Sequence, residues 1–169
     1  MKAHFTMMAA YNAWCNERIY DVAAQLSEAD YKADRGAFFK SVHGTLNHIL
    51  VADRIWMKRF TGQGEIARSL DAILFDHLPD LRQARQAEDE RIVATIESLS
   101  ESDLAGPLRY RMMTSPTEIE QPLASALAHF FNHQTHHRGQ VHCLLTGFGL
   151  DAPVLDLMAF QRQTGIGMS

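Results

Sequence analysis

Residues 122–147 read PLASALAHFFNHQTHHRGQVHCLLTG, and their pattern gives the strongest indication of the protein's architecture. Its apolar side chains recur every three or four residues, which is the period of an amphipathic α-helix. Pro122 suits the first turn of such a helix and Gly147 suits its end. One broad apolar face of the helical wheel contains Leu123, Ala126, Leu127, Phe130, Val141, Leu144 and Leu145. The segment therefore predicts a long helix that packs one face against a core.

Three earlier segments, at about residues 4–26, 41–60 and 79–99, have the same periodicity. Together the four segments predict an all-α protein built as a four-helix bundle. Ser41 is suited to the N-cap of the second helix, and Pro79 to the first turn of the third. The mixed charges of residues 83–91 predict that this part of the third helix covers the outside of the bundle.

The connections between these helices differ in length. About eighteen residues separate the second and third helices, which is long enough for a crossover between distant corners of the bundle. We therefore expect a topology other than simple up-down-up-down. Residues 108–113 and 117–121 flank Thr114-Ser-Pro116 and predict a small hairpin before the fourth helix. Residues 149–160 predict a short additional helix or turn.

The chain as a whole has 169 residues, a 46% hydrophobic content and a formal net charge of −4. Its size favours a single domain that spans residues 1–169. The acidic balance and the lack of a lysine- or arginine-rich run argue against a nucleic-acid partner. No apolar run approaches the roughly 20 residues of a transmembrane helix, so we expect a cytoplasmic protein without a membrane partner. Cys15 and Cys143 are too few for a disulfide framework, and we expect both to be buried.

Two of the nine histidines are well placed to share a metal ion. His133 and His137 are four residues apart, so a helix puts them on one face with Cβ atoms about 5–6 Å apart. The pairs 129/133 and 133/136 also have suitable spacing. The wheel favours the first pair, because His137 lies within the apolar face and His133 lies at its border. A third ligand from elsewhere would complete a site.

The second helix supplies a candidate for that third ligand. Its polar residues form one narrow stripe, made of His43, Asn47, Arg54 and Lys58, and we expect His43 to face water. His48 lies about 100° from the middle of the stripe and is expected to point into the bundle. Three neutral imidazoles would leave coordination positions for water or substrate, as in catalytic rather than structural zinc sites.

Asp53 lies near the centre of the apolar face of the second helix. A buried carboxylate without a partner is costly, so we expect it to be paired with Arg138 or His137. In that position Asp53 would orient a metal ligand. The alternative is a purely structural pair between Asp53 and Arg138.

Three stretches resemble the DinB/YfiT-like family of helical-bundle metalloenzymes: residues 11–18 (YNAWCNER), 44–56 (GTLNHILVADRIW) and 133–140 (HQTHHRGQ). The resemblance covers nearly the whole chain and implies a four-helix bundle with a long crossover, often as a homodimer. It also implies a divalent metal held by His48, His133 and His137, the same trio that the wheel favours. Zinc and nickel are the ions that we expect, and iron is a further candidate.

Three functions are compatible with these residues. Members of that family with assigned chemistry transfer low-molecular-weight thiols, so the first hypothesis is a metal-dependent thiol S-transferase that stabilises a thiolate for attack on a small electrophile. The second is a hydrolase that activates a metal-bound water. It cannot use the HExxH mechanism, because no glutamate lies between His133 and His137. The third is a non-catalytic, dimeric metal-binding or stress-related bundle.

Overall fold

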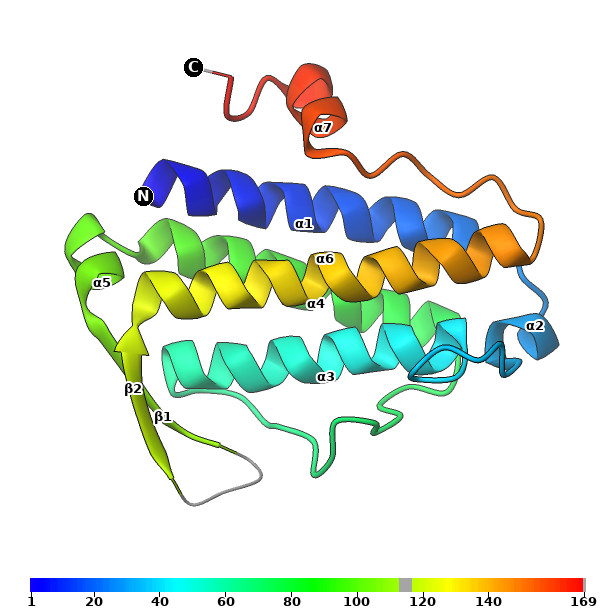
Figure 1. Ribbon diagram of the computed structural model, residues 1–169, viewed down its shortest axis with the longest axis horizontal. Coiled ribbons are helices and arrows are strands. Elements are labelled where there is room, and N and C mark those ends of the chain that lie inside the picture. Colours follow the sequence, from blue (N-terminus) through cyan, green and yellow to red (C-terminus); the bar gives the residue numbers. More distant parts are fainter. Residues whose placement is uncertain (113–116, 169) are drawn as a thin grey trace.

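Four long helices form a bundle in the computed structural model, which describes residues 1–112 and 117–168 (Figure 1). They are α1 (Lys2–Ala23), α3 (Val42–Thr61), α4 (Leu78–Ser98) and α6 (Leu123–Gly147). The shorter elements are α2 (Glu28–Lys32), α5 (Glu101–Ala105), β1 (Pro107–Arg111), β2 (Glu118–Pro122) and α7 (Leu157–Thr164). The predicted all-α bundle is confirmed, and each predicted helix differs from the observed one by only a few residues at its ends.

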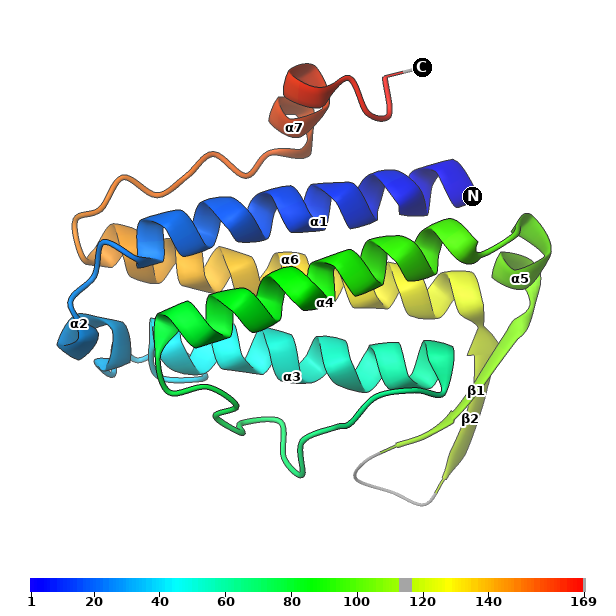
Figure 2. The same cartoon turned by 180° about the vertical axis from the view of Figure 1, so that it is seen from behind.

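The connection between α3 and α4 runs back along the whole length of the bundle, so these two helices point the same way (Figures 1 and 2). Helices α1 and α6 point the opposite way. Both α1 and α3 pack against α4 and α6, so α3 and α4 are neighbours in the bundle. The prediction of a topology other than up-down-up-down is therefore confirmed, but the crossover does not join distant corners. Its length is needed to return the chain to the end of the bundle at which α3 began.

The predicted helix signals are seen at the ends of the elements. The Ser41 hydroxyl accepts a hydrogen bond from the backbone N–H of Gly44 at 3.0 Å and so caps α3. Pro79 lies in the first turn of α4. The hairpin is confirmed as an antiparallel pair of strands, and Thr114-Ser-Pro116 lies outside the described residues. The extra helix after α6 is α7, whose Phe160 is buried against α1.

Only one of the two expectations for the cysteines is confirmed. Cys15 of α1 is buried, whereas Cys143 is exposed on the outer side of α6. Cys143 lies among residues of α6 that line an outer groove, next to Gly139 and Gly147, so it is not part of the core. Among the described residues, no helix combines the length and the apolar character needed to cross a bilayer.

The core has two large apolar clusters with a buried polar layer between them, and a third, smaller cluster packs α7 against α1. One large cluster includes Trp56, Ile92 and Phe130, and the other includes Leu81 and Leu145. The polar layer comprises Asn12, Asn16, Asp53, Arg85, Asp89, Gln134 and Arg138, all of which are buried. On each long helix these polar residues fall between the residues of the two clusters. The middle of the bundle is therefore polar and its two ends are apolar.

Part of the charged segment of α4 belongs to this layer. The expectation that residues 83–91 cover the outside was wrong for Arg85, Glu88 and Asp89, which are buried. Arg85 Nη2 lies 3.0 Å from Asp89 Oδ1, and the Asp89 carboxylate accepts a hydrogen bond from the Asn16 amide at 2.9 Å. A helix with charges on two faces gives no periodic signal for the face that packs inward, which explains the error.

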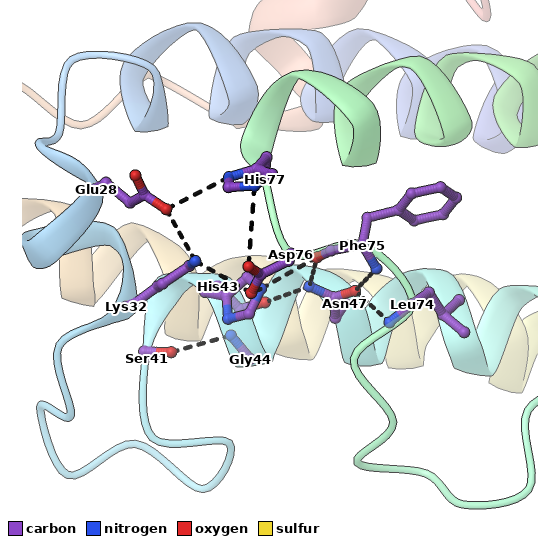
Figure 3. A network of polar contacts seen from close by, with 10 residues as sticks. All are labelled: Glu28, Lys32, Ser41, His43, Gly44, Asn47, Leu74, Phe75, Asp76 and His77. Carbon is purple, nitrogen blue, oxygen red and sulfur yellow. Dashed lines mark hydrogen bonds and ion pairs between the residues drawn. The ribbon is translucent and has the colours of Figure 1, made fainter.

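The end of the crossover is tied to α3 by Asn47, which is fully buried (Figure 3). Asn47 Oδ1 accepts hydrogen bonds from the backbone N–H groups of Leu74 at 2.8 Å and Phe75 at 3.0 Å. The His43 ring lies 3.1 Å from the carbonyl oxygen of Phe75 and is also buried. His43 and Asn47 therefore contact the crossover, and the prediction that His43 faces water was wrong.

We expect Asn47→Ala to lower the free energy of unfolding by roughly 2–3 kcal/mol, because two partly buried backbone N–H groups would lose their acceptor. Chemical denaturation at neutral pH measures this loss. Ser98→Ala is a suitable control, because the Ser98 hydroxyl makes only an exposed contact at the end of α4 and should matter by less than about 0.5 kcal/mol. Equal losses for the two variants would contradict the anchoring role of Asn47.

Candidate metal centre

Helices α3 and α6 bring three imidazole rings together in the bundle. His48 Nε2 lies 3.3 Å from His133 Nε2 and 3.2 Å from His137 Nε2. One ring nitrogen of each histidine lies within 4.8 Å of the other two. A tetrahedral ion with bonds of about 2.0–2.1 Å separates its ligands by roughly 3.4 Å, so the two shorter separations fit such an ion. The three histidines favoured by the sequence form a group that could hold a metal.

The remaining ring nitrogens of two of these histidines are held by oxygen acceptors. His48 Nδ1 lies 2.7 Å from the carbonyl oxygen of Leu70, and His137 Nδ1 lies 2.8 Å from Gln140 Oε1. Since these oxygens can only accept, each Nδ1 carries the proton and each Nε2 has a free lone pair. Contacts of this kind fix the orientation of a ring and make it a better metal ligand.

The local environment keeps the three rings neutral. Burial lowers the pKa of His48 to about 4. Burial and the neighbouring His137 and His48 rings lower the pKa of His133 to about 3. The pKa of His137 is also lowered, again chiefly by burial. At pH 7 all three rings are therefore in the neutral form that binds metal ions.

The segment before α3 closes one side of the group. The Phe39 ring stacks on the His48 ring with a centroid distance of 3.7 Å and an interplanar angle of 16°. This close approach depends on Gly44, because a Cβ atom there would lie 2.1 Å from the carbonyl oxygen of Phe39. Glycine at this position therefore allows the Phe39 ring to lie over the His48 ring. The Phe39 ring in turn limits access to the histidine group from that side.

The other predicted site residues lie elsewhere. Asp53 Oδ2 accepts hydrogen bonds from Arg85 at 2.6 Å and Gln134 at 2.9 Å, so the expected pairing with Arg138 or His137 was wrong. The Arg138 guanidinium instead donates to Asn12. The reason is that α4, read as a solvated helix, supplies the buried cation that Asp53 requires.

Three contacts of the histidine group escaped the sequence analysis. Gln140 lies one turn after His137, and this spacing was a usable signal. The Leu70 contact comes from a backbone carbonyl in an irregular loop, so no side-chain pattern could have indicated it. Phe39 also lies outside the long helices.

A pocket of about 360 Å³ opens beside the group, between α3, α6 and the hairpin. Two of the three histidines, His48 and His133, form part of its wall. The other lining residues are Ala52, Ile55, Trp56, Arg59, Leu70, Tyr110, Met112, Ile119 and His129. A small molecule in this pocket would therefore lie next to the ring nitrogens.

Comparison with known proteins identifies the family to which the chain belongs. The model of the DinB family matches residues 1–168. The chain belongs to the DinB family. It is 24% identical to Protein DinB of Bacillus subtilis (strain 168) in an alignment 168 residues long. The alignment covers 91% of this chain and 92% of that protein.

Two solved structures support the fold assignment. A DinB-like protein from Bacillus cereus superposes with a TM-score of 0.64 at 16% identity, covering 83% of this chain and 89% of that one. The DinB-like protein YjoA from Bacillus subtilis gives a TM-score of 0.62 at 16% identity, covering 88% and 97%. At these identities the likeness concerns the fold.

We expect Gln140→Leu to weaken divalent-metal binding by roughly 10–100-fold, because the His137 ring would lose the oxygen that orients it. Competition with a chromophoric chelator measures the affinity. Gln140→Glu keeps an acceptor at the same place and should bind metal at least as tightly as the wild type. If the leucine and glutamate variants had the same affinity, the contact between Gln140 and His137 would have no role in metal binding.

Proposed function

We propose that this protein binds one divalent metal ion through His48, His133 and His137 and catalyses a thiol S-transferase-type reaction on a small electrophile. The proposal rests on three neutral imidazoles whose nitrogens have the spacing of metal ligands, beside a pocket. Three protein ligands leave a coordination position for another molecule. Zinc or nickel would suit three imidazoles, and iron is a further candidate.

When bound, such an ion would lower the pKa of a thiol and so favour the thiolate, which is the reactive nucleophile. The residues of the chain have different tasks. Leu70 and Gln140 hold the rings in the orientation that leaves each Nε2 free. Phe39 covers one face of His48, and apolar side chains such as Ile55 and Trp56 would hold a small electrophile in the pocket.

The composition of the pocket favours thiol transfer over hydrolysis. Activation of water for hydrolysis needs a nearby general base. Among the described residues that line the pocket there is no aspartate or glutamate, so the exposed His129 is the one imidazole outside the histidine group that could act as such a base. A thiol that has already lost its proton needs no such base, so this reaction makes fewer demands on the protein.

A cobalt-substituted protein tests the proposal. Protein without an affinity tag is loaded with Co²⁺ and titrated with glutathione, cysteine and 2-mercaptoethanol. We expect at least one thiol to produce a saturable sulfur-to-cobalt charge-transfer band, and chlorodinitrobenzene then to be converted to the thioether faster than without protein. If cobalt binds and no thiol alters the spectrum, the proposal of thiol transfer fails and the non-catalytic metal-binding bundle is favoured.

A further inference from the structure

Helix α3 lines the pocket with a continuous stripe that begins at the histidine group. His48, Ala52, Ile55 and Arg59 follow one another at spacings of four, three and four residues, which places them on one face of the helix. Arg59 is the only arginine, lysine, aspartate or glutamate among the described lining residues. The far end of the pocket therefore carries a single positive charge.

The surroundings of Arg59 prepare it to bind a ligand. Its guanidinium carbon lies 4.5 Å from the ring centroid of Trp56 and 4.5 Å from that of Tyr110. Burial lowers the pKa of Arg59. Within residues 1–112 and 117–168 no carboxylate lies within ion-pair distance of it, whereas Arg85 has two such partners and Arg109 has one. The Trp56 and Tyr110 rings fix the position of the guanidinium. Within the described residues its N–H groups have no anionic partner.

We propose that the pocket takes a small molecule with a carboxylate or a similar anionic group, which binds Arg59 while the reacting end of the molecule faces the histidine group. A planar guanidinium matches a carboxylate through two parallel hydrogen bonds. The chain has a net charge of −4, so the attraction comes from Arg59 itself and not from a general positive field. This inference rests on the proposed function and specifies its substrate class.

The geometry also limits the length of the ligand. Arg59 lies eleven positions after His48, which corresponds to about 16 Å along the helix axis. Side chains on a helix lean toward its N-terminus at both positions, so the guanidinium of Arg59, which lies over the Trp56 ring, stays well separated from the His48 ring along the axis. A ligand that reaches both places must be extended, and a very short acid cannot do so.

A series of ω-mercaptocarboxylic acids, each paired with its amide, tests this inference on the full-length protein. The series runs from mercaptoacetic acid to long-chain members. Affinity is measured with cobalt-loaded protein by the charge-transfer band, and with zinc-loaded protein by the NMR shifts of the Arg59 Nε–H and the Trp56 indole N–H. We expect acids of intermediate length to bind about tenfold or more tightly than their amides, because the amide loses the charge-assisted hydrogen bonds. Mercaptoacetic acid is too short to reach Arg59, so it should bind no more tightly than its amide through that residue.

Substitutions at Arg59 separate this effect from binding of the carboxylate to the metal. Arg59→Gln should abolish the preference for acids, and Arg59→Lys should keep part of it. Lys58→Gln is the matched control, because the exposed Lys58 does not line the pocket. Equal affinity of wild type for acids and amides, or a preference that persists in Arg59→Gln, would overturn the inference. If carboxylates shift the Arg59 signal while no thiol changes the cobalt spectrum, the inference stands and thiol transfer fails.

Discussion

Replacement of His133 by alanine is expected to weaken divalent-metal binding by roughly 100-fold or more. Loss of a group that only orients a ligand already costs about 10–100-fold in affinity, and His133 would be a ligand itself. The metal-free protein should keep its fold, because the ring is only partly buried and its nearest partners are two other histidines. Competition with a chromophoric chelator measures the affinity, and thermal denaturation of the metal-free protein measures stability.

His142→Ala is the matched control for this substitution. His142 lies on the same helix and outside the histidine group. We expect its removal to leave metal affinity unchanged within about twofold, since surface substitutions away from special features have small effects. A similar loss of affinity in both variants, or no loss in His133→Ala, would show that the ion binds elsewhere.

Replacement of Arg85 by alanine is expected to lower the free energy of unfolding by about 3–5 kcal/mol, because it leaves buried carboxylates without their cation. Arg85 contacts both Asp53 and Asp89 in the polar layer and is itself 2% exposed. Arg82→Ala removes an exposed pair with Asp21 from the same helix and should cost no more than about 1 kcal/mol. Chemical denaturation of both variants at pH 7 measures the difference, and equal losses would contradict a structural role for the buried layer.

The destabilisation of Arg85→Ala should also depend on pH. Burial raises the pKa of Asp53 to about 6, and the Arg85 guanidinium opposes this shift. Without Arg85 the pKa of Asp53 should rise further above its unfolded value. The folded variant would then hold a proton that the unfolded chain has released, so its stability should fall as the pH rises from about 5 to 8. Denaturation midpoints at the two ends of this range check the sign.

The sequence was sufficient for the long helices and for the three histidines, for the same physical reason. Helical periodicity determines which residues share a face, and it placed His48, His133 and His137 toward the bundle interior. Periodicity works when one face is apolar, as in α6. It failed for α4, where Arg85 and Asp89 are charged and buried, and consequently for the partner of Asp53.

The residues that the sequence could not reveal are those positioned by irregular backbone. The long loop after α3 returns beside that helix, where Asn47 fixes it and where Leu70 reaches His48. Such contacts depend on the path of a loop that has no repeating pattern. The site therefore combines ligands that periodicity predicts with supports that only the tertiary structure supplies.

X-ray absorption spectroscopy of the zinc-loaded protein, prepared without an affinity tag, would identify the atoms that hold the metal ion. We predict one zinc ion per chain, with three imidazole nitrogens at about 2.0–2.1 Å and a further light-atom ligand that the protein does not supply. His133→Ala should lose this spectrum. A zinc shell that contains cysteine sulfur, a shell made only of oxygen atoms, or protein that retains no zinc would contradict a metal centre built from His48, His133 and His137.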